Sequence, residues 1–201
     1  MKRFFLLAGL AAGTQVAQAQ SIAAGTVSLG GGIGYSSATS KSSGFGGGEA
    51  TEKTFTLTPY AGYFVADNVA VGVNLGYSAQ SNGGSDAITS LQLGPFAQYY
   101  KLLSEQFGLL GTLSAGYQRR FVPTNGGDAI GKGFYATLAP GIIFLPVPRF
   151  GLTASIGGLG YNSTTFKQPV NGGNVETKQS TFNANFGLDN LRIGGVFYLG
   201  R

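Results

Sequence analysis

The stretch 69–80, VAVGVNLGYSAQ, has an apolar residue at every odd position and Ala, Gly, Asn, Gly, Ser and Gln between them. A period of two is typical of a β-strand, because successive side chains point to opposite faces of the sheet. Beyond residue 19, no stretch of the sequence carries an apolar stripe at helical spacing. The pattern therefore predicts an all-β chain.

Eight segments follow this alternation. In the first five the apolar residues stand at odd positions, within 27–35, 55–63, 69–79, 91–99 and 107–117. In the sixth and seventh, 134–144 and 150–156, they stand at even positions. The eighth segment runs from about 181 to 199 and changes phase within itself.

The phase change in the eighth segment predicts an irregular strand. Its apolar set passes from Phe182, Ala184, Phe186 and Leu188 to Leu191, Ile193, Phe197 and Leu199. An extra residue in a strand moves every later side chain to the other face. We therefore predict a β-bulge near Asp189 and Asn190, and a second one at Gly157-Gly158.

The connections between segments alternate in length. Short ones are expected at 66–68, 102–105 and 146–148, and long ones at 37–50, 81–87, 122–131 and 162–177. Three of the long ones contain Asn-Gly-Gly, at 82–84, 125–127 and 171–173, which suits the positive φ angles of hairpin tips. Phosphate binding by these glycines is not expected, because no helix or G-x-G-x-x-G spacing follows them.

The non-apolar face of the segments decides between two kinds of barrel. A soluble eight-stranded barrel would turn its apolar set inward and would need many Lys and Glu side chains outside. Here the other set is Gly, Ser, Thr, Asn and Gln, only 10% of residues are charged, and the charges cluster in connections and at segment ends. These features favour a closed eight-stranded antiparallel up-and-down transmembrane β-barrel with its apolar face against lipid.

Aromatic residues provide a second criterion, because membrane barrels carry them at both interfaces on the lipid face. We expect two belts on this face. One, toward the long connections, contains Tyr35, Tyr77, Tyr117 and Phe182, and the other contains Tyr63, Tyr99, Phe144, Phe150 and Phe197.

The first residues indicate export. Lys2 and Arg3 precede an apolar run over 4–12, and Ala17-Gln18-Ala19 forms a small-x-small cleavage pattern. The run is shorter than the roughly 20 residues of a spanning helix, so residues 1–19 are interpreted as a cleaved signal peptide and 20–201 as one barrel domain. The expected location is the bacterial outer membrane, with both termini periplasmic. No nucleic-acid partner is expected, because the positive charges are scattered singly.

Four stretches of the chain are specific enough to compare with known families: TPYAGYFVADNVAVGVNLGY at 58–77, LGPFAQYY at 93–100, APGIIF at 139–144 and LRIGGVFYLG at 191–200. In these stretches the chain resembles the small eight-stranded outer-membrane proteins of the OmpA/OmpX-like porin superfamily, especially the Bacteroidetes-type forms. The resemblance implies an assembly signal read by the outer-membrane insertion machinery, formed by Arg192, Gly194, Phe197 and Leu199. The chain departs from many members by ending on Gly200-Arg201 instead of an aromatic residue.

The sequence offers little for catalysis. It contains no His and no Cys, whereas the membrane-embedded enzymes of the resembled family use a His. We therefore expect no catalytic residue, no cofactor and no metal site. Three charges are candidates for the lumen. Asp189 and Arg192 flank the predicted bulge and could form an ion pair or a gate, and Arg120 is a lumenal or an interface-level charge.

Two functions remain open at this stage. The first is a noncatalytic barrel that supports the envelope or binds an extracellular partner through four long loops. The alternative is a narrow channel or a binding pocket for a small solute. Eight strands leave a lumen that side chains nearly fill, and we expect these inward residues in it: Tyr60, Phe64, Phe96, Tyr100 and Tyr135. Outer-membrane lipid is the expected surrounding partner.

Overall fold

The computed structural model describes residues 21–41, 49–82, 86–124, 128–170 and 173–200, apart from the side chains at 41, 49–50, 168–170, 173–174 and 189. Residues 1–19, the predicted signal peptide, lie outside this part of the chain. Within it, no helix is both long and apolar enough to cross a membrane.

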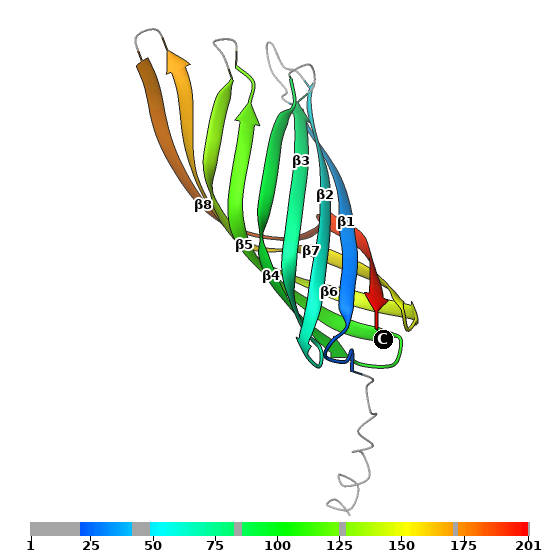
Figure 1. Ribbon diagram of the computed structural model, residues 1–201. Helices are drawn as coiled ribbons and strands as arrows, with labels where there is room; N and C mark the ends of the chain where they lie inside the picture. The colour runs from blue at the N-terminus through cyan, green and yellow to red at the C-terminus, as the bar shows by residue number, and fades with distance from the viewer. Residues whose placement is uncertain (1–20, 42–48, 83–85, 125–127, 171–172, 201) are drawn as a thin grey trace, which may run out of the picture.

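The described chain forms eight antiparallel strands that close into a barrel (Figure 1). Each strand pairs with its neighbours in sequence, and the last strand pairs with the first. The strands are β1 (Val27–Lys41), β2 (Glu49–Ala66), β3 (Val69–Asn82), β4 (Ile88–Leu102), β5 (Phe107–Val122), β6 (Ala129–Val147), β7 (Phe150–Val170) and β8 (Gly173–Leu199). The predicted fold class and strand number are confirmed.

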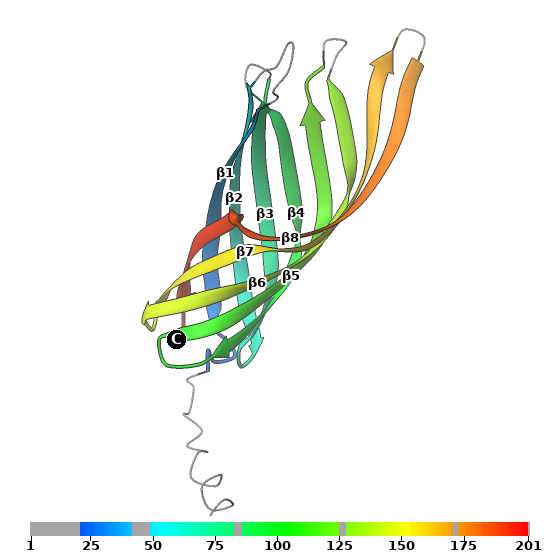
Figure 2. The same ribbon diagram turned by 180° about the vertical axis from the view of Figure 1, so that it is seen from behind.

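The two ends of the barrel differ. At one end, here called the short-turn end, tight connections join β2 to β3, β4 to β5 and β6 to β7, and the C-terminus lies there too (Figure 2). At the other, the long-loop end, the strands project as hairpins of unequal length.

The apolar residues of the alternating pattern lie on the outside. Val71, Leu93 and Leu109 are 40%, 59% and 45% exposed, although they are central in their strands. Burial of these three side chains in a core would have contradicted the membrane interpretation. Their exposure is what a barrel surrounded by hydrocarbon chains requires.

Aromatic side chains form two belts on this outer face. Toward the long-loop end, the four predicted residues are exposed, and three more join them: Phe55, Phe134 and Tyr161. Toward the short-turn end, Tyr63, Tyr99, Phe144 and Phe197 are exposed, and Phe150 packs its ring 4.9 Å from that of Phe197. The belts were predicted from residue type and position, and the strand register confirms their placement.

Both predicted bulges are present. Ile156 pairs with Leu191, but the next residue, Gly157, pairs with Phe186, so that residues 187–190 of β8 have no partner on β7. Gly157 has a φ of +99°, and a Cβ there would overlap the carbonyl oxygen of Asn185. A glycine is therefore required where β7 turns its side chains to the other face.

The expected long connections are shorter than predicted. The connection expected over 162–177 is mostly strand, because β7 continues to Val170 and β8 begins at Gly173. Ser163 pairs with Ser180 in this extension, and Lys167 forms an ion pair with Glu176 at 2.5 Å. The prediction was wrong because polar residues on both faces show no alternation, yet they pair well above the apolar band. The tips 83–84, 125–127 and 171–172 lie outside the described residues, so their turn types stay predictions.

Candidate functional site: the barrel lumen

Apolar side chains fill the lumen at the short-turn end. Phe64, Tyr100 and Tyr198, which we call the aromatic plug, are fully buried, with ring centroids 5.4–6.5 Å apart. They come from β2, β4 and β8, so the plug spans the barrel from several sides. The remaining residues of this cluster are Ile22, Ala70, Leu102, Leu110, Ile143, Leu145 and Val196.

The segment before β1 closes the barrel below the plug. Ile22 is fully buried, and its N–H donates to Oδ1 of Asn68 at 2.9 Å while its carbonyl accepts from the Asn68 N–H at 2.9 Å. The Gly25 N–H donates to the carbonyl of Phe64 at 2.8 Å. These hydrogen bonds hold the segment against the β2–β3 turn, so this end of the lumen is sealed by protein.

A polar layer follows the plug. The Tyr100 hydroxyl donates to Oε1 of Gln98 at 2.9 Å, and Nε2 of Gln98 donates to Oγ1 of Thr112 at 3.2 Å. Tyr60 and Phe96 meet edge to face at 5.3 Å in the same region. The expected inward position of Tyr60, Phe64, Phe96, Tyr100 and Tyr135 is therefore confirmed.

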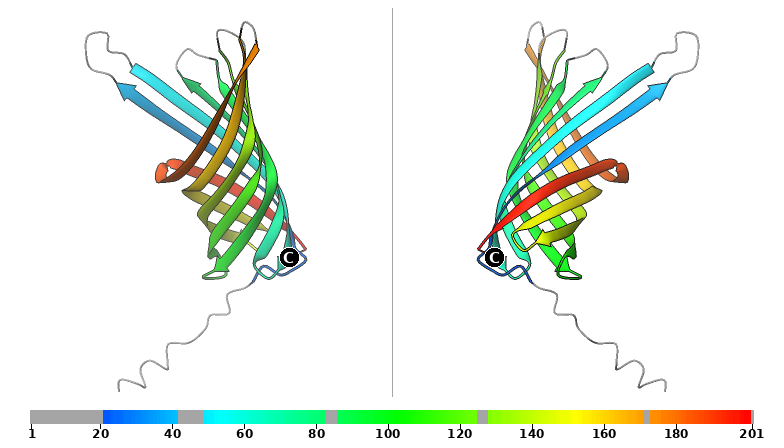
Figure 3. Two further views of the ribbon diagram at one scale, coloured as in Figure 1. Left: turned by 90° about the vertical axis from the view of Figure 1, so that its left-hand side faces the viewer. Right: turned by 90° about the vertical axis from the view of Figure 1, so that its right-hand side faces the viewer.

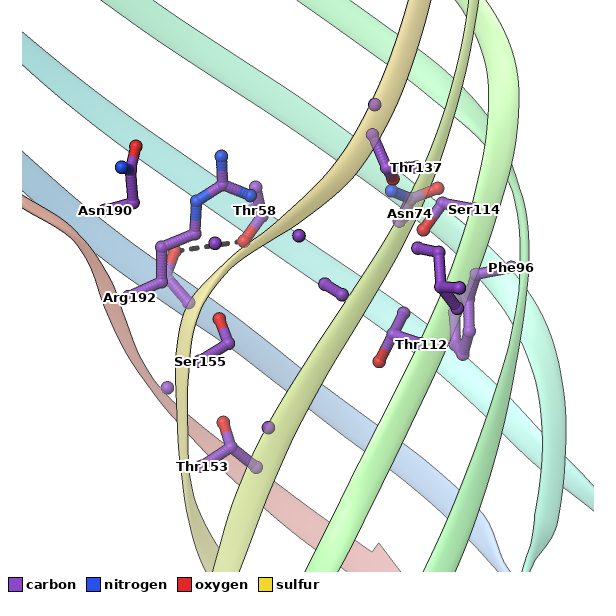
Figure 4. A pocket seen from close by; sticks show the side chains of 18 of the residues that line it. Thr58, Asn74, Phe96, Thr112, Ser114, Thr137, Thr153, Ser155, Asn190 and Arg192 are labelled. Atoms are coloured by element: carbon purple, nitrogen blue, oxygen red, sulfur yellow. Dashed lines mark hydrogen bonds between the residues drawn. The ribbon is translucent and has the colours of Figure 1, made fainter. Parts of the chain in front are cut away.

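Above this layer the lumen contains two cavities. The lower cavity, about 350 Å³, is lined by hydroxyl, amide and glycine groups, including those of Thr58, Ser155 and Asn190 (Figure 4). The upper cavity, about 310 Å³, is lined by residues such as Ser78, Gln80 and Thr181.

Three amide side chains line both cavities: Gln92, Asn162 and Asn183. Nε2 of Gln92 donates to Oε1 of Gln118 at 3.3 Å, and Nε2 of Gln118 donates to Oγ1 of Thr164 at 2.6 Å. This chain of hydrogen bonds crosses from β4 through β5 to β7. Because Gln92 pairs with Gln118, Gln118 with Gly133, and Gly133 with Thr164 in the register, these hydrogen bonds form a polar ladder along the inner wall.

The candidate lumenal charges lie at different levels. Arg192 lines the lower cavity and Arg120 lines the upper one. The side chain of Asp189 lies outside the described part of the structure, so its pairing with Arg192 stays a hypothesis. Of the proposed assembly signal, Gly194 lines the lower cavity with Arg192, whereas Phe197 and Leu199 point out toward lipid.

The chemistry of the cavity walls is that of hydrogen bonding. In the described chain, no group of three or more His, Cys, Asp or Glu side chains converges on one point. The walls offer amides, hydroxyls, the phenol of Tyr135, which donates to Asn74 at 3.3 Å, and the guanidinium of Arg192. Such a wall can bind polar or anionic groups.

Sequence reasoning did not single out the Gln92–Gln118–Thr164 ladder. Gln92 and Gln118 belong to the polar set of their segments, which was the available signal, whereas Thr164 lies in the stretch 162–177 that was expected to be a connection. Which polar residues become neighbours on the lumen wall depends on the register between strands, and alternation within one strand does not contain that information.

A closed antiparallel barrel with an apolar, aromatic-belted exterior and a polar interior has the architecture of an integral outer-membrane protein. The chain matches the outer membrane protein beta-barrel domain family over residues 4–189, and it belongs to this family of the bacterial outer membrane.

Solved structures with similar folds include three outer-membrane proteins. The N-terminal β-barrel domain of Pseudomonas aeruginosa OprF is 12% identical with a TM-score of 0.47, and the match covers 90% of this chain and 100% of that one. Neisserial surface protein A is 13% identical with a TM-score of 0.46, covering 87% and 97%. Escherichia coli outer membrane protein W is 16% identical with a TM-score of 0.46, covering 89% and 100%. No curated protein matches the chain in sequence.

Proposed function

We propose that this protein is a noncatalytic, nonconducting barrel that serves envelope structure or surface interaction through its long-loop end. In this proposal the short turns and both termini face the periplasm, and the projecting hairpins face outward. The observation that carries it is the sealed short-turn end: the aromatic plug and the buried Ile22 leave the lumen open only above them. A closed lumen supports a binding or structural role over transport.

The projecting β7–β8 hairpin is the part of the described chain best placed for contact outside the membrane. Its extension past the aromatic belt is mostly polar and is held by strand pairing and by the exposed Lys167–Glu176 ion pair. An exposed ion pair adds little stability, at most about 1 kcal/mol, so this surface is free to vary for recognition.

Trimming this hairpin tests the proposal. Residues 163–180 are replaced by Asn-Gly, which joins Asn162 to Thr181, two residues that face each other in the register. The trimmed protein is expected to insert and to keep its heat-modifiable migration on gels, but to reproduce the detergent sensitivity or lost surface binding of a null strain. Leu103→Ser, an exposed change at the opposite end, is the matched control. Normal envelope resistance and normal surface binding in both the trimmed and the null strains would contradict the proposal.

A second candidate is a binding pocket for a small solute. The two polar cavities favour it, since their volumes of about 350 and 310 Å³ are at the lower end of ligand-pocket sizes. Calorimetric titration of the purified barrel with small polar solutes tests it. Saturable binding that Asn183→Leu weakens would support this candidate, because Asn183 lines both cavities.

The proposed partners follow from the surface. Outer-membrane lipid contacts the apolar exterior, and the insertion machinery is proposed to read the end of β8, where Phe197 and Leu199 face outward.

A further inference from the structure

The first and last strands of the barrel are not paired along their whole length. β1 and β8 pair from Val27 with Leu199 up to Gly34 with Arg192, and no pair joins them beyond that point among the described residues. β1 continues to Lys41 on the side of β2, and β8 continues back to Gly173 on the side of β7. Figure 3 shows the upper parts of these two strands diverging. We call this gap the seam.

The outer rim of the seam is apolar on the side of β8, where Phe186 and Leu188 are exposed, and it begins on β1 at the exposed Tyr35 of the aromatic belt. The lower end of the seam therefore lies where this belt borders the hydrocarbon of the membrane. Unpaired strand edges are unfavourable in hydrocarbon, because lipid chains offer no hydrogen bonds to the backbone.

The inner rim of the seam is polar and opens on the lower cavity. Gly31 and Gly32 of β1 and Asn185, Asn190 and Arg192 of β8 all line that cavity, so both bordering strands contribute to its wall. The unpaired stretch 187–190 of β8 precedes Arg192, and β8 and β1 diverge from that level on (Figure 3). The lower cavity therefore meets the seam at the lower end of the seam.

Arg192 lies at the lower end of the seam, where its outer and inner rims meet. It is the β8 member of the last β1–β8 pair, and its guanidinium lies beside Thr58 in the cavity (Figure 4). No Asp or Glu is among the described residues that line the lower cavity with it. A guanidinium has five donors in a planar fork that suits carboxylate and phosphate oxygens. A carboxylate or phosphate group that enters this cavity would therefore find a matching donor in Arg192.

From this arrangement we infer that the seam binds an anionic amphiphile from the surrounding bilayer. Its carboxylate or phosphate head lies in the lower cavity on Arg192, and its single acyl chain passes out between β1 and β8 into the membrane. The head is then desolvated only where a guanidinium and hydroxyl groups replace water, and the chain never leaves an apolar environment. This inference specifies the ligand class for the binding-pocket candidate above and rests on it.

Direct binding can be measured because the chain has no cysteine. A fluorophore is attached to Ser36→Cys, on the free edge of β1, in full-length protein in phosphatidylcholine nanodiscs. Nitroxide-labelled stearate is expected to quench it saturably and to be displaced by unlabelled stearate. The same label on Val73→Cys, an exposed position on β3 away from the seam, should show only the linear quenching of bulk lipid.

Charge variants identify the head-group site. Arg192→Gln should weaken stearate binding about tenfold or more, as expected for loss of hydrogen bonds between charged groups. Arg120→Gln, which removes the same charge from the upper cavity, should leave binding unchanged. Equal effects of the two variants, or none from either, would overturn the assignment. Heat-modifiable migration shows that each variant is folded.

The chemistry of the probe separates the head from the chain. Stearate and a monoalkyl phosphate of equal chain length should both bind, and their ratio distinguishes a carboxylate source from a phosphate source. Stearyl alcohol and acetate should bind at least tenfold more weakly, because each lacks one half of the ligand. Equal binding of stearate and stearyl alcohol would overturn the inference.

Closing the seam tests the lateral path. Residues 35 and 191 come next after the last β1–β8 pair, so Tyr35→Cys with Leu191→Cys can form a disulfide across it. Oxidation should abolish stearate binding, and reduction should restore it in the same sample. Stearate binding that survives oxidation would contradict lateral access. Binding of polar solutes without stearate would leave the pocket candidate intact and remove this inference alone.

Discussion

Asn68 shows what a single side chain contributes at the short-turn end. It has a φ of 63°, which few residues other than glycine and asparagine adopt readily, and it completes the two-residue Asp67-Asn68 turn. Its Oδ1 accepts from Ile22, and the Asp67 carboxylate accepts from the Ala24 N–H at 3.0 Å. One turn therefore reverses the chain and also fixes the segment that seals the lumen.

Substitutions at Asn68 separate these two roles. Asn68→Gly keeps the backbone conformation but loses the side-chain hydrogen bond, so the free energy of unfolding should fall by about 1 kcal/mol. Asn68→Val adds backbone strain and should cost about 1–3 kcal/mol more. Urea unfolding in phospholipid vesicles measures both. Equal midpoints for the two variants would show that the backbone conformation has no role.

At the scale of elements, the two bulges make β7 and β8 differ from the other strands. A one-residue irregularity on β7 at Gly157 faces the longer unpaired stretch 187–190 on β8. Bulges bend strands and increase their twist. The combination reverses the facing of both strands, and the end of β1–β8 pairing at Arg192 falls beside the unpaired stretch 187–190.

Gly157→Ala is expected to destabilise the barrel by about 1–3 kcal/mol, because the positive φ and the Asn185 carbonyl both oppose a Cβ. Gly111→Ala is the matched control, since a Cβ there meets nothing within 4 Å. The midpoint of urea unfolding should fall for the first variant and stay unchanged for the second. A similar midpoint for both would show that the bulge tolerates another backbone conformation.

At the scale of the whole molecule, the outer and inner surfaces of the barrel are organised differently. The exterior is uniform around the barrel and banded along its axis, with apolar residues between two aromatic belts. The interior changes along the axis from the aromatic plug through polar layers to the open long-loop end. The exterior sets how the protein sits in the membrane, and the interior sets what can enter it.

Leu113 tests the membrane-facing surface. It lies midway between Leu109 and Tyr117 on β5 and is exposed, so Leu113→Arg should reduce stability by about 2–4 kcal/mol in a bilayer. Val175→Arg, exposed on the β8 extension, should change it little. The folded fraction in vesicles, read from heat-modifiable migration, measures the difference. Equal folding of the two variants would contradict a lipid-facing position for Leu113.

The aromatic plug leads to a prediction about ion conductance. The wild-type protein should show no conductance steps in planar bilayers. Tyr100→Ala should introduce small steps, because removing a buried ring leaves space that connects to the lower cavity. Phe134→Ala, at an exposed ring of the outer face, should remain silent. Steps of the same size in the wild-type protein would refute closure by the plug.

The sequence by itself determined the fold class, the outward face of each strand and the positions of both bulges. These features are local, because each follows from whether neighbouring residues alternate between lipid and lumen. Leu93 and Leu109 could be placed outside, and Gly157 and Asn190 near irregularities, without any knowledge of strand partners. The hairpin lengths escaped this reasoning because Ser163 and Ser180 pair without an apolar face.

Only the tertiary structure decided which side chains meet in the lumen and where the pairing of the first and last strands ends. The meeting of Phe64, Tyr100 and Tyr198, the polar ladder through Gln118 and the end of β1–β8 pairing at Arg192 all depend on the register accumulated around the closed barrel. That register sums seven strand pairings and the bulges within them before the last strand meets the first. Such a sum is a property of the whole ring, so no single segment of the sequence specifies it.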